Sequence, residues 1–203
     1  ELNRRLAGAA AEIAGTITVT TTDSLASIVF PAVAAFRKSH PLVRLHVVLS
    51  NRDADLAQHE ADVAIRPTRS PPESLIGRRA AVFGYGIYAS APDIDGWIAL
   101  DETLGAIPSS RWLRERLSGE VPVMSVNSMW ATAQACAAGA GKALLPDYLA
   151  RQFGLERIEG PIRELQSEVW LLTHEDLSRT PRIRAFVAAT ALHIRRALVD
   201  GDA

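Results

Sequence analysis

The sequence has almost no cysteine and almost no net charge. Cys136 is the single cysteine, so an internal disulfide is excluded, and the residues around it lack a metal-binding spacing. This usage is typical of a reducing compartment and predicts a cytoplasmic protein. The 22 basic and 23 acidic residues give a net charge of −1 and form no block of like charge. The chain therefore lacks the basic surface typical of nucleic-acid binding, and any DNA contact would have to come from another segment.

Long apolar runs and a secretory leader are also missing. The longest uncharged stretch, 121–141, is interrupted by Pro122, Asn127, Gln134 and two glycines, which excludes a membrane span. No charged segment followed by an apolar one marks the N-terminus. The 203 residues are 48% apolar and 22% charged, which is typical of a folded protein with a sizeable core.

Patterns for common chemistries fail along the whole chain. His59-Glu60 and His174-Glu175 have no second histidine at the zinc-protease spacing, and no Gly-x-Ser-x-Gly elbow occurs. The segment 139–142 resembles a phosphate loop, but it has Cys136 and Ala143 where glycine and Ser or Thr are required. The sequence predicts no metal site, no cofactor and no catalytic residue.

Hydrophobic periodicity alternates between strand and helix in the first third of the chain. The predicted elements are a strand at 16–19, a helix at 25–36, a strand at 45–49, a short helix opening at 50–53 and a strand at 61–66. This order predicts a parallel sheet with right-handed crossovers. An amphipathic helix over 1–14 is also predicted. It is too short to be stable alone and would either pack on its own domain or pair with another helix.

The same strand and helix order returns in the second half of the chain. Residues 77–90 are predicted to be extended, and an irregular stretch follows. The later predictions are a helix at 112–117, an edge strand at 121–126, a helix opened by Ser128 and ending near 138, a buried strand at 143–145, a strand at 169–173 and an amphipathic helix at 183–198.

Three polar loops have the position expected of a ligand site. Thr20–Ser24 and Ser50–Asp53 each follow a strand, and Asn127-Ser128 precedes a helix. Ligands of open parallel sheets bind at such strand ends, where helix N-termini offer free N–H groups. Arg66 ends the third strand and would supply a cation suited to a carboxylate, so a small anion is the expected ligand. The alternative is that these polar residues only cap helices.

The order of several motifs resembles the effector-binding domain of LysR-type transcriptional regulators. They cover nearly the whole chain: Gly15-Thr16-Ile17-Thr18-Val19, Phe30–Phe36 with His40–Leu45, Ala61–Arg66, Ala137–Pro146 and Arg182–Val187. The resemblance implies an α/β fold of two Rossmann-like lobes, similar to type 2 periplasmic binding proteins. Lobe I would comprise 15–88 plus 168–203 and lobe II 89–167. Hinge strands would lie near Tyr88-Ala89 and Gln166–Val169, and 1–14 would be the end of a linker helix.

The resemblance also implies an effector in the cleft between the lobes. Family contacts fall at Thr21, Thr22 and Asp23 after the first strand, at Asn51 after the second, and at Ser128 in lobe II. With Arg66, these residues form the predicted site for a small, carboxylated effector. Asp23 departs from the pattern, because its carboxylate would repel an anion unless Arg66 or a water offsets it.

The leading hypothesis is a ligand sensor that shifts the conformation of a homodimer or homotetramer, with DNA bound by a helix-turn-helix module outside this chain. The runner-up is a solute-binding subunit of an uptake system, which shares the two-lobed architecture. A third hypothesis is an enzyme with Asp23 or Asp53 as base, although neither has a paired acid or nucleophile.

Overall fold

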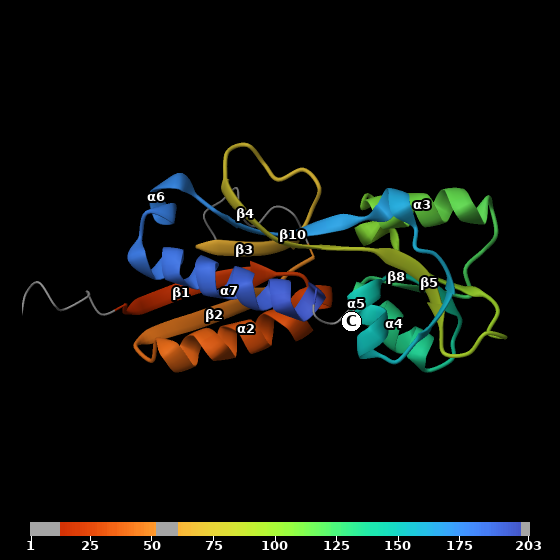
Figure 1. Ribbon diagram of the computed structural model, residues 1–203. Coiled ribbons are helices and arrows are strands. Elements are labelled where there is room, and N and C mark those ends of the chain that lie inside the picture. Colours follow the sequence, from red (N-terminus) through yellow and green to blue (C-terminus); the bar gives the residue numbers. More distant parts are fainter. Residues whose placement is uncertain (1–12, 52–60, 200–203) are drawn as a thin grey trace, which may run out of the picture.

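A computed structural model describes residues 13–51 and 61–199 of the chain, which form two five-stranded sheets flanked by helices (Figure 1). Each sheet with its helices forms one lobe, and the predicted two-lobed α/β fold is confirmed. Most of the predicted linker helix 1–14 and the predicted short helix after Asn51 lie outside the described residues.

Lobe I contains the sheet with strand order β2-β1-β3-β10-β4. Its strands are β1 (Gly15–Thr21), β2 (Val43–Leu49), β3 (Val63–Pro67), β4 (Ile76–Phe83) and β10 (Ser167–Thr173). Its helices are η1 (Asp23–Leu25), α2 (Ala26–Ser39), α6 (Glu175–Ser178) and α7 (Pro181–Val199). β1 is parallel to β2 and β3, as predicted, whereas β10 is antiparallel to both β3 and β4.

Lobe II contains the sheet with strand order β7-β6-β8-β5-β9. Its strands are β5 (Tyr85–Ala89), β6 (Trp97–Leu100), β7 (Met124–Val126), β8 (Lys142–Pro146) and β9 (Glu156–Glu159). Its helices are η3 (Glu102–Leu104), α3 (Pro108–Leu117), α4 (Met129–Ala137), α5 (Asp147–Gln152) and η4 (Arg163–Leu165). β6 lies between β7 and β8 and occupies part of the stretch predicted to be irregular.

The chain passes between the lobes twice. The first crossing is at Gly84, because β4 belongs to the lobe I sheet and β5 to the lobe II sheet. A Cβ atom at Gly84 would lie 2.6 Å from the Asp147 Oδ2 atom, so any larger residue at this position would displace the Asp147 carboxylate. The predicted division after Tyr88 falls at the far end of β5. Residues 160–166 make the second crossing, just before the predicted segment at 166–169.

Helix α7 covers the lobe I sheet with an apolar face and lies beside α2 (Figure 1). Ile183, Phe186 and Ile194 recur at helical spacing and are fully buried, which confirms the predicted stripe. The Phe186 ring meets the Phe36 ring edge to face at 5.1 Å between centroids. These aromatic contacts hold the two helices together on one face of the sheet.

No helix in the described part of the chain combines the length and the apolar character needed to span a membrane.

Candidate functional site

The carboxyl end of β1 carries three of the predicted site residues. Thr21 is fully buried, and its hydroxyl has no hydrogen-bond partner among the described residues. A buried hydroxyl without a partner costs about 1–3 kcal/mol, which a bound polar group can recover. Thr22 occupies the N-cap position of η1, with its hydroxyl 3.1 Å from the Ser24 hydroxyl. This strand end therefore offers polar groups that the protein itself satisfies only in part.

Asp23 and Asn51 pair with each other across the ends of β1 and β2. The Asn51 Oδ1 atom accepts the Asp23 backbone N–H at 3.2 Å, and its Nδ2 group donates to the Asp23 Oδ2 atom at 2.9 Å. The structure thus brings together two predicted residues that are 28 positions apart. A neutral carboxamide, rather than a cation, makes this contact with the Asp23 carboxylate.

Arg66 is almost completely buried where the three parallel strands of lobe I end. Its Nη1 group donates to the Ser50 carbonyl, and its Nη2 group donates to the Thr20 hydroxyl at 2.9 Å. These contacts join the ends of β1, β2 and β3, so the guanidinium contributes to the architecture of this edge. Charged hydrogen bonds of this kind are stronger than neutral ones.

Ser128 belongs to the other lobe and caps α4. Its hydroxyl accepts the Ala131 N–H at 3.0 Å, which confirms the predicted N-cap. Within the described ranges, no hydrogen bond joins Ser128 to another predicted site residue. However, α4 packs against η1 of lobe I, so Ser128 starts a helix that contacts the loop after β1.

An aromatic cluster between the lobes was missed by the sequence analysis. The Tyr148 ring of α5 meets the Phe83 ring of β4 at 5.2 Å, and Phe83 meets Tyr85 of β5 at 5.6 Å. Burial raises the pKa of Tyr85 to about 12 and also raises the pKa of Tyr148, so both hydroxyls keep their protons. Phe83 and Tyr85 are two positions apart, but Tyr148 lies far along the chain, and the only sequence signal that the three share is aromatic character.

In Figure 1, α5 of lobe II faces α2 and α7 of lobe I. A hollow of about 430 Å³ lies between these elements. It is lined by Ser27, Ile28, Tyr148, Arg151, Gln152 and Ala197. Elements of both lobes thus border a common space.

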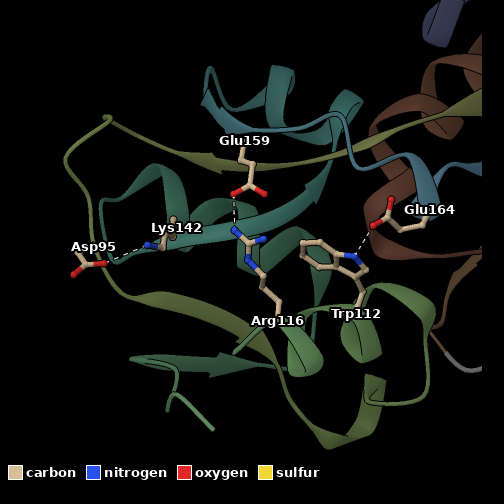
Figure 2. A network of polar contacts seen from close by, with 6 residues as sticks. All are labelled: Asp95, Trp112, Arg116, Lys142, Glu159 and Glu164. Atoms are coloured by element: carbon tan, nitrogen blue, oxygen red, sulfur yellow. Dashed lines mark hydrogen bonds and ion pairs between the residues drawn. The ribbon is translucent and has the colours of Figure 1, made fainter. Parts of the chain in front are cut away.

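The second crossing is held by contacts with both lobes. The Trp112 Nε1 group of α3 donates to the Glu164 side chain at 3.2 Å (Figure 2). Just before the crossing, Arg116 of α3 pairs with Glu159, the last residue of β9, at 2.7 Å. From lobe I, Arg69 donates to the Glu164 carbonyl at 2.9 Å. Glu164 of the crossing therefore contacts both lobes, through its side chain and its backbone carbonyl.

The one cysteine has a structural environment. Cys136 is fully buried in α4, and its thiol donates to the Tyr88 carbonyl at 3.2 Å. Burial raises the pKa of the Cys136 thiol to about 11, so the reactive thiolate is scarce at neutral pH. No group of three or more potential metal ligands gathers in the ranges 13–51 and 61–199.

The two lobes, the paired crossings and the polar strand ends define a two-lobed α/β binding domain. The family model of the LysR substrate binding domain matches residues 10–91 and 102–193. The chain belongs to this family and is the effector-binding domain of a LysR-type transcriptional regulator.

Solved structures show the same fold at low sequence identity. The regulatory domain of CrgA, a LysR-type regulator from Neisseria meningitidis, aligns with a TM-score of 0.74 at 16% identity and covers 89% of this chain and 99% of that one. The MetR regulatory domain from N. meningitidis aligns with a TM-score of 0.68 at 16% identity and covers 91% of this chain and 96% of that one. Full-length AphB, a virulence activator from Vibrio cholerae, aligns with a TM-score of 0.64 at 19% identity and covers 93% of this chain and 74% of that one. No curated protein sequence matches this chain.

Proposed function

We propose that this domain senses a small, carboxylated metabolite that binds between the lobes. The six contact residues are Thr21, Thr22, Asp23, Asn51, Arg66 and Ser128. Binding favours one arrangement of the lobes, and that preference changes the conformation of a homodimer or homotetramer. DNA is bound by a helix-turn-helix module outside this chain, which agrees with the near-zero net charge. The domain itself performs no chemistry and requires no cofactor.

The buried hydroxyl of Thr21, which has no hydrogen-bond partner among the described residues, carries this proposal. It lies at the carboxyl end of a parallel strand, where ligands of such sheets bind. The Thr22 hydroxyl and the Asp23–Asn51 pair adjoin it. A ligand carboxylate would accept from these hydroxyls, and Arg66 behind them would offset the charge of Asp23.

Transport and catalysis are less well supported. A solute-binding subunit has the same architecture, but the chain belongs to a family of transcriptional regulators. For catalysis, Asp23 is engaged by Asn51, and Asp53 lies outside the described residues.

Exposed apolar side chains on two edge strands support a homodimer. Val48 and Leu49 of β2 are 39% and 48% exposed, and Met124 of β7 is 39% exposed. Val121 and Val123, just before β7, are 82% and 63% exposed. Exposed apolar edges favour pairing with another chain. Light scattering should show a dimer, and a monomer at every usable concentration would contradict this part of the proposal.

A ligand screen tests the site directly. Short mono- and dicarboxylates are screened by thermal shift, and the binders are measured by calorimetry. Thr22→Ala and Ser128→Ala should each weaken the tightest binder about 3- to 10-fold, the worth of one hydrogen bond. Ser39→Ala is the control, because its exposed hydroxyl contacts only the Ala35 carbonyl in α2. Unchanged affinity in both site variants would place the ligand elsewhere.

A further inference from the structure

A second hollow, of about 560 Å³, lies on lobe I between the edge strand β4 and helix α7. Its volume is within the range of about 300–1,000 Å³ that is typical of small-molecule pockets. None of the six proposed contact residues lines it, and β3 and β10 separate β4 from β1 in the sheet. The hollow is therefore distinct from the proposed effector site.

The floor of this hollow is apolar. Leu171 of β10 and Ile183 of α7 line it and are almost completely buried. At its rim, Ile76 of β4 is 50% exposed, and Val187 of α7 is half-buried. An apolar group that bound here would be removed from water, which is favourable.

Two arginines line the same hollow, one from the sheet and one from the helix. Arg78 of β4 is the cross-strand partner of Leu171, so its side chain projects on the sheet face that α7 covers. Arg184 lies near the start of α7, three and four positions before Val187 and Ala188, and these three share one face of the helix. Neither guanidinium has a hydrogen bond or an ion pair with another described residue.

The charge around the hollow has one sign. Among the described residues that line it, none is Asp or Glu. Pro181 lines the hollow and begins α7, whose first turn contains no acidic residue, so the partial positive charge of this helix end adds to that of the arginines. A guanidinium matches the two oxygens of a carboxylate with a pair of N–H donors. The hollow thus combines an apolar floor with groups that attract an anion.

We propose that this hollow binds an amphipathic carboxylate, with its apolar chain on Leu171 and Ile183 and its carboxylate held by Arg78 and Arg184. A medium-chain fatty acid is the simplest ligand of this class. The proposal does not depend on the proposed function, because the two sites share no residue.

Calorimetry with octanoate, decanoate, octanol and octylamine tests the class of ligand, at concentrations below micelle formation. Decanoate should bind about 10-fold more tightly than octanoate, because two more methylene groups are buried. Octanol and octylamine should each bind about 10-fold more weakly than octanoate, because neither offers an anion to the arginines. Equal binding of octanol and octanoate, or no binding of either carboxylate, would overturn the proposal.

Charge variants test the two arginines. Arg78→Gln and Arg184→Gln should each weaken decanoate binding about 3- to 5-fold, the worth of one exposed charged contact. Arg195→Gln is the matched control, because Arg195 is an exposed arginine of the same helix that does not line the hollow. An equal loss in Arg195→Gln would show that only the net charge matters and would overturn the proposal.

A steric variant tests the hollow itself. Ala188→Phe places a ring in the space meant for the ligand and should weaken decanoate binding at least about 10-fold. Ala189→Phe is the control, because Ala189 is the next residue of the helix, is exposed and does not line the hollow. Circular dichroism confirms that each variant is folded. Unchanged decanoate affinity in Ala188→Phe would overturn the proposal.

Two other outcomes identify a different occupant or a different site. Thr22→Ala should leave decanoate binding unchanged, and a loss there would show that decanoate binds between the lobes and would overturn the proposal. A dimer that Ala188→Phe dissociates in light scattering, without decanoate binding, would show that a second copy covers the hollow. The short carboxylates of the screen should not respond to Arg78→Gln, so failure of one site is distinguishable from failure of the other.

Discussion

The two lobes share one plan of strands but differ in how they use the polar groups at their strand ends. In each sheet the first three strands are parallel, and the fourth strand is antiparallel to its neighbours on both sides. This fourth position is taken by the strand that has just entered from the other lobe. In lobe I, the Thr21 hydroxyl has no partner among the described residues, whereas in lobe II the Ser128 hydroxyl caps a helix. The two lobes therefore share a topology, but the strand end of lobe I has a hydroxyl without a partner among the described residues, whereas the serine in lobe II caps a helix.

The lobes also share a continuous apolar core. Buried side chains of both sheets form one cluster, joined between the lobes by the Phe83 and Tyr148 rings. Because the apolar core runs through both lobes, we expect the two lobes to unfold together. The following predictions test this cooperativity and the contrast between the strand ends.

The largest expected effect comes from the core of lobe I. Phe186→Ala removes a fully buried ring that contacts Phe36, and should lower the free energy of unfolding by about 3–5 kcal/mol. Urea denaturation should show both lobes unfolding in one transition at lower urea. Leu192→Ala, on the same helix but 48% exposed, is the control and should have little effect. Two separate transitions would show that the lobes are independent.

Arg66 should rank next if its main contribution is to hold the strand ends together. Arg66→Met leaves the Ser50 carbonyl and the Thr20 hydroxyl without these donors, and should lower the free energy of unfolding by about 2–3 kcal/mol. Arg79→Met is the control, because its exposed pair with Glu168 contributes about 1 kcal/mol or less. Equal effects in chemical denaturation would contradict the structural role of Arg66.

Ser128 tests the strand end of lobe II. Ser128→Ala removes the cap of α4 and should lower the free energy of unfolding by about 1 kcal/mol. Ser125→Ala, at an exposed position in β7, should leave the unfolding midpoint nearly unchanged. If the two variants unfold at the same urea concentration, the cap contributes nothing, and the contrast between the strand ends disappears.

A substitution at Thr21 should raise the free energy of unfolding, whereas those above lower it. Thr21→Val replaces an unpartnered hydroxyl with a methyl group of similar shape, and should raise the free energy of unfolding by about 0.5–1 kcal/mol. Calorimetry should show weaker binding of the carboxylate found in the screen. Thr190→Val is the matched control, since its buried hydroxyl in α7 also lacks a partner among the described residues. It should show the gain in stability with unchanged affinity.

Local signals in the sequence predicted most of the secondary structure. The alternation of apolar residues gave β1, and the apolar spacing from Leu25 to Phe36 gave a helix that ends before Pro41. The sequence also indicated that Ser128 caps α4. In contrast, β6 has only four residues and follows a turn, so no period could be recognised. The extended stretch 77–90 carried no sign that its two halves join different sheets.

The structure brings some of the predicted site residues together, and their role in binding stays a prediction. It joins Asp23 to Asn51 and locates Arg66 at the same edge of the sheet. The partners of Arg66 were not predictable, because Thr20 and Arg66 are 46 positions apart and meet only through strand pairing. The ring contact between Phe83 and Tyr148 crosses the lobes and is equally invisible in a local pattern.

The sequence by itself determined the order of strands and helices and the helix caps, because each is encoded in residues close together along the chain. It also indicated the family, through the order of such local motifs over nearly the whole chain. Only the tertiary structure decided where the chain changes sheets and which polar groups are left unsatisfied. These features depend on strand pairing and side-chain packing between distant segments. Among the described residues the Thr21 hydroxyl has no hydrogen-bond partner, and that depends on its neighbours in space rather than in sequence.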